Sequence, residues 1–288
     1  MQEPIITPDC DDEYLVDYMF DLHGYLILKN AIAPEDLKAM NQWIDDHWEY
    51  VERGTEEGYV ETAGQWIGNV ETHTYGGSDG LNFQNVIEGG EVFEKLIDYP
   101  VWINRVCRFV NPVNGLSIHE NFITIRGKGG YIGPHCGGHL PICYMTFRQV
   151  NTGDWMVGQI NMLMALTDIG PGDGPTTLIP GSHKARFPHP VLTNPDGSGQ
   201  AYRGDFAGGN AIGMKELYME AGDVAMFTDT ITHGSATRQN DGYRRNVVYR
   251  YSPRFIRSRF HYVPSPELLG RLTEERRTII QPIPPRTP

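Results

Sequence analysis

From Leu116 onward, the chain consists of short extended runs separated by glycine, proline, asparagine or aspartate. Some runs alternate apolar and polar residues, and others are wholly apolar. Such patterns, recurring at this spacing, are typical of a β-sandwich or β-barrel. The runs read HENFITIR, YIGPHCG, PICYMTFRQ, WMVGQINMLMALTDI, GPTTLIP, ELYMEAGDVAMFTD and NVVYRYSPRF. The 33 glycines and 20 prolines among 288 residues also favour a turn-rich architecture over a helical bundle.

Helical patterns precede this β region. Apolar residues recur at spacings of three and four from Leu37 to Trp48, which predicts an amphipathic helix over residues 35–52. Other expected elements are a helical segment at Asp11–Leu22, a strand at Tyr25–Lys29, a loop region at 53–88, a helical pattern at Glu91–Val110 that Pro100 interrupts, and a helix at Pro266–Thr273. We expect one α+β, mainly β domain over 1–288, divided into a helical part at about 1–112, a β core at about 113–255 and a tail at 256–288.

The charge balance narrows the class of partner. A net charge of -12 and a pI near 5.2 argue against nucleic-acid binding, because phosphates are held by clustered lysine and arginine. No run approaches the roughly 18 apolar residues of a membrane span, and the N-terminus is acidic where a signal peptide is basic and then apolar. The four cysteines lack CxxC spacing. We expect a cytoplasmic protein whose partners are small molecules, with no nucleic acid and no membrane.

The stretch Gly129–Leu140, GGYIGPHCGGHL, places His135 and His139 among five glycines and a proline. A helix interior is excluded, because Gly costs about 1 kcal/mol there and Pro about 3 kcal/mol. The stretch is expected at a strand edge, where imidazoles can ligate a metal and the backbone can approach a ligand closely. No acidic residue falls between Glu120 and Asp154, so the residues around His135 in the sequence supply no carboxylate.

A second histidine in a strand-edge context is His233, in GDVAMFTDTITHGSATR. Eleven residues later, Arg244 opens the predicted strand Arg244–Ser252. An arginine that enters a buried strand needs an anion, since an unpaired buried charge is strongly destabilising, and its guanidinium matches a carboxylate bidentately. Two strand-edge histidines, a nearby arginine for a dicarboxylate and a double-sheet scaffold are typical of a non-haem iron centre that uses 2-oxoglutarate.

The sequence resembles the phytanoyl-CoA dioxygenase family of Fe(II)/2-oxoglutarate oxygenases over nearly its whole length. The matching segments are HGYLILKNAIAPEDL, MALTDIGPGDGPTTLIPGSHK, GDVAMFTDTITHGSATR and RRNVVYRYSPR. The resemblance implies a double-stranded β-helix of the jelly-roll, cupin-like kind with N-terminal helices packed on it. It also implies that His135 and His233 are the iron ligands, and that Arg244 with Ser235 holds the distal carboxylate of 2-oxoglutarate. Arg245 is the alternative clamp, because alternation lets only one of the two arginines face inward.

One departure from the family pattern concerns the iron site. The family's first motif is His-x-Asp, whereas this chain has Gly137 two residues after His135. Replacement by Gly or Ala occurs in the iron halogenases of the wider superfamily, and it opens a coordination position for chloride. The alternatives are a third ligand supplied by water or by another residue. The residues considered for that position are Glu120, Asp154, Asp229, His139 and Cys136.

The expected activity is the oxidation, by hydroxylation, of a C–H bond in a small organic molecule, with Fe(II), 2-oxoglutarate and O2. The alternatives are chloride-dependent halogenation at Gly137 and a non-oxygenase, metal-binding cupin-like protein. Gln159 and Asn161 lie on a predicted strand at Gly158–Leu166, and their alternation with apolar residues allows them to point inward toward 2-oxoglutarate, with Gln159 as the expected contact. The alternative is that both are polar core residues with a purely structural hydrogen bond. The His183-Lys184 pair in PGSHK is expected to be structural.

Overall fold

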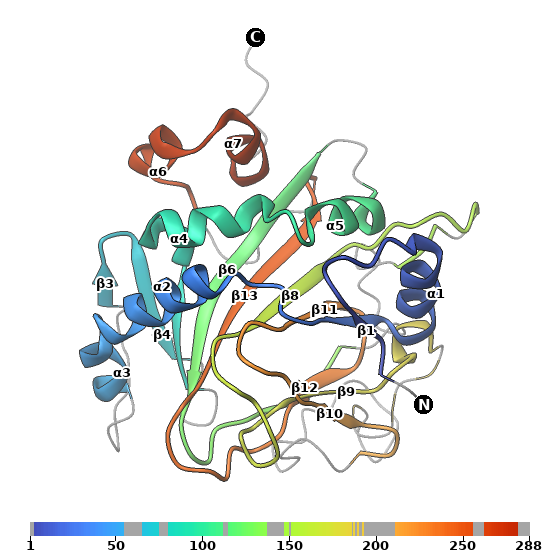
Figure 1. Ribbon diagram of the computed structural model, residues 1–288, viewed down its shortest axis with the longest axis horizontal. Coiled ribbons are helices and arrows are strands. Elements are labelled where there is room, and N and C mark those ends of the chain that lie inside the picture. Colours follow the sequence, from blue (N-terminus) through green and yellow to red (C-terminus); the bar gives the residue numbers. More distant parts are fainter. Residues whose placement is uncertain are drawn as a thin grey trace.

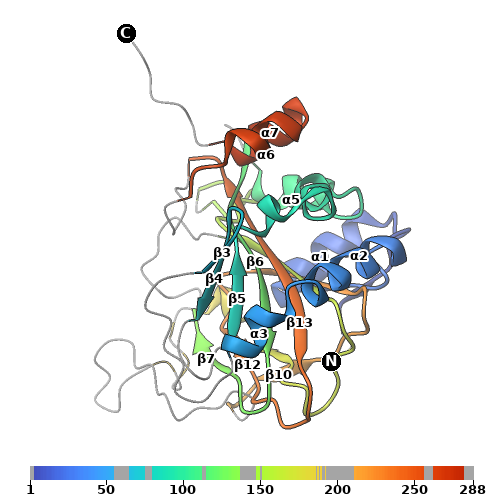
Figure 2. The ribbon, with the colours of Figure 1, turned by 90° about the vertical axis from the view of Figure 1, so that its left-hand side faces the viewer.

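The computed structural model describes residues 3–54, 65–74, 80–111, 115–136, 147–149, 151–185, 187, 189, 192, 211–255 and 262–281. Its strands form two sheets that face each other, and helices cover the outer side of the larger sheet (Figures 1 and 2). Across these residues, no helix is both long enough and apolar enough to cross a membrane.

The larger sheet contains nine strands within the described residues, and the smaller contains four. In sheet order, the larger consists of β1 (Ile5–Ile6), β2 (Tyr25–Leu28), β11 (Val224–Thr228), β8 (Ile160–Ala165), β13 (Arg244–Pro253), β6 (Leu116–Arg126), β5 (Leu81–Gln84), β4 (Val70–Thr74) and β3 (Gln65–Ile67). The smaller consists of β10 (Lys215–Leu217), β9 (Thr176–Leu178), β12 (His233–Ser235) and β7 (Ile132–His135). Apart from the parallel pair β1 and β2, all named pairs are antiparallel. The expected jelly-roll fold is confirmed.

The strand alternation of the large sheet divides the interior into two cores. On β13, Tyr249 and Tyr251 face the helices, where their hydroxyls each donate to a backbone carbonyl at 2.7 Å. Val248, the residue before Tyr249, faces the small sheet and packs in a second core that includes Leu178 of β9 and Phe227 of β11. Residues of the same parity as Val248 therefore point into the space between the two sheets.

The helices lie mainly at the front of the chain, with a second group at its end. They are α1 (Glu13–His23), α2 (Pro34–Asp45), α3 (Trp48–Gly54), α4 (Glu91–Glu94), α5 (Ile103–Val110), α6 (Pro266–Arg271) and α7 (Glu274–Ile280), with short 3-10 turns η1 (Val86–Gly89), η2 (Lys95–Asp98) and η3 (Ser182–Lys184). Figure 2 shows α1, α2 and α5 on the side of the large sheet away from β7 and β12. The helices thus bury one face of the sheet and leave its other face to the small sheet. The predicted interruption near Pro100 is confirmed, because η2 ends at Asp98, before this proline, and α5 begins at Ile103, after it.

The prediction of one helix over residues 35–52 is wrong. The helix ends at Asp45, and a second one begins at Trp48. In a continuous helix, the backbone N–H of His47 would bond to the carbonyl of Trp43. Instead, the His47 imidazole lies 2.7 Å from that carbonyl oxygen, and the backbone N–H bonds to Ile44. The apolar periodicity continued through this break, so the pattern alone did not reveal it.

The prediction of a long loop at 53–88 is also wrong for the residues described there, because they include three strands. The part of the chain at about 1–112 is therefore less helical than expected. Strands β3, β4 and β5 extend the large sheet beyond β6. Gly68, with φ of 60°, makes the turn between β3 and β4. Val70 and Phe83 are fully buried, whereas the neighbouring positions are polar. Strands this short, and this rich in Thr, Glu and Asn, carry too weak an alternation to be recognised from the sequence.

Candidate functional site

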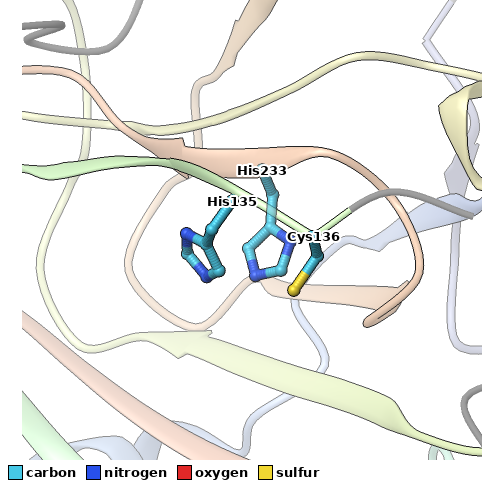
Figure 3. Close-up of side chains that lie close together, drawn as sticks. All are labelled: His135, Cys136 and His233. Carbon is cyan, nitrogen blue, oxygen red and sulfur yellow. The ribbon is translucent and has the colours of Figure 1, made fainter. Parts of the chain in front are cut away.

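His135 and His233 form a cross-strand pair at the end of the small sheet. His135 is the last residue of β7 and His233 is the first of β12, and their ring centroids are 4.2 Å apart. On its other side, His233 pairs with Leu178, which belongs to the core between the sheets. Directly opposite residues of antiparallel strands share a face, so both imidazoles point toward the large sheet. Figure 3 shows the two rings side by side, with the Cys136 thiol next to them.

Each imidazole is held through Nδ1 by the carbonyl two residues earlier in the chain. His135 Nδ1 lies 2.9 Å from Gly133 O, and His233 Nδ1 lies 2.8 Å from Ile231 O. A carbonyl oxygen only accepts hydrogen bonds, so Nδ1 is assigned the proton and Nε2 the lone pair. Metal-binding histidines usually donate their second ring N–H in this manner. The two rings are therefore oriented and protonated as metal ligands require.

Burial also keeps His233 in its neutral form. Its side chain lies in the interior, and the residue is only 6% exposed. Desolvation, followed by the nearby charge of His135, lowers the pKa of His233 to about 3. A neutral imidazole is the form that ligates a metal. At neutral pH, this histidine is thus available for ligation without losing a proton.

A thiol and a carboxylate lie beside the histidine pair. The ligand atoms of His135, Cys136 and His233 all lie within 4.8 Å of one another. The Cys136 thiol donates to Asp229 Oδ2 at 3.5 Å, and Asn161 Nδ2 donates to Asp229 Oδ1 at 3.0 Å. Desolvation alone would raise the pKa of Asp229, but the positive charge of Arg250 and the hydrogen bond from Asn161 help to lower it below its ordinary value. An ionised carboxylate therefore adjoins the two imidazoles.

The carboxylates considered from the sequence as third metal ligands differ sharply in position. Asp154 is exposed to solvent. Glu120 is buried, but its carboxylate forms an ion pair with an arginine of β13. Only Asp229, among these three, contacts a residue of the histidine cluster. Gly137 and His139 lie outside the described residues.

Arg244 and Ser235 are the residues predicted to hold 2-oxoglutarate, and both are buried on inward-facing positions. Arg244 is 1% exposed and donates through Nη1 to the carbonyl of Gly174. Its cross-strand partner on β6 is Arg126, also buried, whose Nη1 donates to Ser235 Oγ at 2.8 Å. Ser235 lies two residues after His233 on β12. Two guanidinium groups and a hydroxyl thus lie on this part of the inner face, which suits an anionic ligand.

Arg245, the alternative clamp, faces the opposite way. Its Nη1 donates to Asn41 Oδ1 at 3.1 Å, and its Nη2 pairs with Asp45 Oδ1 at 2.7 Å, both on α2. The guanidinium also lies over the Trp48 ring, 4.9 Å from its centroid. The expected alternation is therefore confirmed, and of the two arginines only Arg244 faces the interior.

Gln159 lies near the cluster of His135, Cys136 and His233 rather than near Arg244. Its Nε2 donates to Asn161 Oδ1 at 2.9 Å, and its backbone oxygen accepts from the N–H of Asp229 at 3.1 Å. Asn161 lies opposite Arg250 on β13, and Arg250 is six residues after Arg244 on that strand. The expected contact between Gln159 and 2-oxoglutarate stays a prediction.

Arg126 was not singled out from the sequence. Its position in the sequence could have revealed it. Arg126 ends the run FITIR, and alternation along a strand places it on the same inward face as Phe122 and Thr124. A charged residue at an inward position of a strand requires a polar partner or a ligand. Its contact with Ser235 places it beside the predicted clamp residues.

Comparison with known proteins agrees with this geometry. A family model described as phytanoyl-CoA dioxygenase (PhyH) matches residues 20–246. A probable phytanoyl-CoA dioxygenase of Caenorhabditis elegans is 22% identical over 239 residues, which cover 81% of this chain and 73% of that protein.

Two solved structures share the fold. HygX from Streptomyces hygroscopicus, with nickel, 2-oxoglutarate and hygromycin B bound, matches with a TM-score of 0.65 and 18% identity over 86% of this chain and 90% of its own. SnoN, a non-heme alpha-ketoglutarate dependent epimerase from nogalamycin biosynthesis, matches with a TM-score of 0.54 and 13% identity over 84% of each chain.

Proposed function

The chain belongs to the phytanoyl-CoA dioxygenase family, and we propose that it is an Fe(II)- and 2-oxoglutarate-dependent oxygenase that hydroxylates a C–H bond of a small organic molecule. The observation that carries the proposal is the His135 and His233 pair, in which both Nδ1 atoms bond to carbonyl oxygens and both Nε2 atoms carry the lone pair. Structural neighbours described with iron or with nickel and 2-oxoglutarate support the same cofactors.

The residues present fit both cofactors. His135 and His233 would hold the iron, as a pair of imidazoles on adjacent strands. Arg244 and Ser235 would hold the distal carboxylate of 2-oxoglutarate, because a guanidinium matches a carboxylate and a hydroxyl can donate to it. Together with O2, these cofactors supply the oxidising power that breaks a C–H bond, which side chains alone do not provide.

Apolar side chains of the inner core border the histidine pair on one side. The Phe227 ring lies 5.0 Å from the His233 ring, and Leu178 pairs with His233 from β9. These contacts limit the access of water to one side of the site. Charge interactions strengthen where water is excluded, so the carboxylate of 2-oxoglutarate would be held more strongly here than on the surface.

The charge beside the histidines favours hydroxylation over halogenation. A halide on the metal would lie next to the ionised Asp229 carboxylate, and like charges a few ångströms apart repel. Hydroxylation adds no anion to this position. A small organic substrate is supported by the hygromycin B bound to the neighbour HygX. The identity of the neighbours does not transfer their substrates to this chain, since one fold serves many reactions.

Turnover of 2-oxoglutarate tests the proposal. The purified protein with Fe(II), 2-oxoglutarate and air should release succinate, slowly without substrate and faster with one, and omission of iron or O2 should stop it. A metal-binding protein of another class would retain iron and release none. Succinate formation that survives iron removal would contradict the proposal.

A matched pair of variants ties this activity to the site. His233→Ala should lose both iron retention and succinate release, because one of the two imidazole ligands is removed. His73→Ala removes an imidazole from β4, the strand next to the edge strand β3, and should retain both. Equal loss in the two variants would point to general destabilisation instead.

A further inference from the structure

We propose that Asp229 is the carboxylate ligand of the metal, supplied from the turn before β12 instead of from the position two residues after His135. This inference rests on the proposed function and specifies its metal site. It is carried by the Asp229 carboxylate, which lies 3.5 Å from the Cys136 thiol, itself within 4.8 Å of the ligand atoms of both histidines. The proposal requires the Cys136 thiol to turn aside and the aspartate to rotate, so that one of its oxygens reaches the histidine pair.

The chain holds Asp229 firmly in this place. Its backbone N–H donates to Gln159 O at 3.1 Å, which ties the turn to the start of β8. The hydroxyls of Thr228 and Thr230, on either side, lie 2.9 Å apart. The turn therefore has a fixed conformation, and Asp229 lies four residues before His233 at the end of β11.

The hydrogen bonds of the carboxylate leave one oxygen aimed at the cluster. Asn161 Nδ2 donates to Oδ1, whereas Oδ2 faces Cys136. Ligating carboxylates are typically hydrogen-bonded through their second oxygen in this way. Asn161 is oriented in turn by Gln159 Nε2 at 2.9 Å. We infer that Gln159 and Asn161 are positioning residues for the ligand.

Cys136 is the competing third ligand. A thiol must lose its proton to ligate, and here the thiol donates that proton to Asp229. Non-haem Fe(II) oxygenases typically use two histidines and a carboxylate, the hard ligand that Asp229 offers. The left-handed backbone at Cys136, with φ of 60°, turns the chain out of β7 immediately after His135.

Metal binding by the apoprotein tests the proposal without turnover. Mn(II) is titrated and its free concentration followed by electron paramagnetic resonance. Asp229→Asn keeps the shape of the side chain and an acceptor for Asn161, so it should fold like the wild type. We expect its Mn(II) affinity to fall by more than the roughly 10- to 100-fold expected for Asn161→Ala, which removes only the supporting hydrogen bond. Asp229→Glu, which keeps a carboxylate, should recover most of the affinity.

Matched controls distinguish the alternatives. Asp154→Asn removes an exposed carboxylate and should bind Mn(II) as the wild type does. Cys136→Ser should also bind normally, and the Co(II)-loaded wild type should lack the near-ultraviolet charge-transfer band of a thiolate ligand.

Three outcomes decide the matter. Unchanged Mn(II) affinity in Asp229→Asn, with normal binding by the wild type, overturns the assignment of Asp229 and leaves the oxygenase proposal standing. A thiolate band that disappears in Cys136→Ser overturns it in favour of Cys136. If the wild type binds neither Mn(II) nor 2-oxoglutarate, the proposed function itself fails.

Discussion

Arg126 and Arg244 are directly opposite each other on β6 and β13, and both side chains are buried. Arg126 donates to Ser235 Oγ, and Arg244 donates to the carbonyl of Gly174, among their other contacts. Guanidinium groups bind carboxylates bidentately, so this pair would favour a dianionic ligand such as the 2-oxoglutarate of the proposed function.

Arg244→Ala should weaken 2-oxoglutarate binding while leaving metal binding in place. Removing one partner of a buried charge pair costs about 2 to 5 kcal/mol, and a loss of this size is expected in the free energy of 2-oxoglutarate binding. Calorimetric titration of the anaerobic Fe(II)-loaded or Mn(II)-loaded protein measures it. Arg245→Ala is the control, because this residue forms a partly exposed ion pair with Asp45 on α2. It should leave 2-oxoglutarate affinity unchanged, and the reverse result would move the clamp by one residue.

Chloride should have no effect on the iron site. If the Asp229 carboxylate occupies or borders the third protein position, a halide gains no favourable place there. The visible spectrum of the anaerobic complex with Fe(II) and 2-oxoglutarate should therefore be the same with and without millimolar chloride. A saturable spectral shift on chloride titration would restore the halogenase interpretation of Gly137.

Gly24→Ala should destabilise the fold strongly. Gly24 ends α1 in the left-handed conformation, with φ of 79°, and a Cβ there would collide with the His183 ring. The backbone conformation alone costs an alanine about 1 to 2 kcal/mol. His183 has little room to move, because it is 4% exposed and its ring lies 4.4 Å from that of Phe147. This packing also agrees with a structural role for His183.

Gly68→Ala is the matched control for this substitution. Gly68 also has a left-handed φ, of 60°, but nothing lies within 4 Å of an added Cβ. Urea unfolding of the two variants should show a larger loss of stability for Gly24→Ala, by at least about 1 kcal/mol for the overpacking. Equal losses would mean that the His183 ring moves aside freely.

Acid should destabilise the protein in a window set partly by His183. Desolvation, aided by the charge of Lys184, lowers the pKa of His183 from its ordinary value of 6.5 to about 4. Between these values the unfolded chain binds a proton that the folded chain excludes, so the free energy of unfolding falls as the pH falls from about 6.5 to about 4. The contribution is on the order of 3 kcal/mol. Urea unfolding across this range should show a shallower pH dependence for His183→Gln, and an identical slope would contradict the assignment.

The sequence revealed the parts of the site that depend on local pattern. His135 and His233 were recognisable because each follows a strand and precedes glycines, and the parity of Arg244 and Arg245 follows from alternation along one strand. Strands β6, β8, β11 and β13 were visible because each lies in one of the short extended runs that turn residues separate, and most of their residues are buried.

The remaining features depend on contacts between distant residues. Asp229 and Cys136 are 93 positions apart, and only the packing of β7 against β12 brings them together. The role of Arg126 likewise depends on Ser235, 109 positions away. The helix breaks at His47, where the imidazole takes the place of the backbone N–H at the carbonyl of Trp43. The apolar periodicity of a helix gives no indication of such a contact. Such features are set by tertiary structure and leave little trace in a local pattern.

The most direct test of the iron and 2-oxoglutarate site is the visible spectrum of the protein after anaerobic addition of Fe(II) and 2-oxoglutarate. Chelation of iron by 2-oxoglutarate in the site of His135 and His233 should produce a weak charge-transfer band with one equivalent of each, and His233→Ala should not show it. A wild-type protein that carries stoichiometric iron and shows no such band with excess 2-oxoglutarate would contradict the central claim.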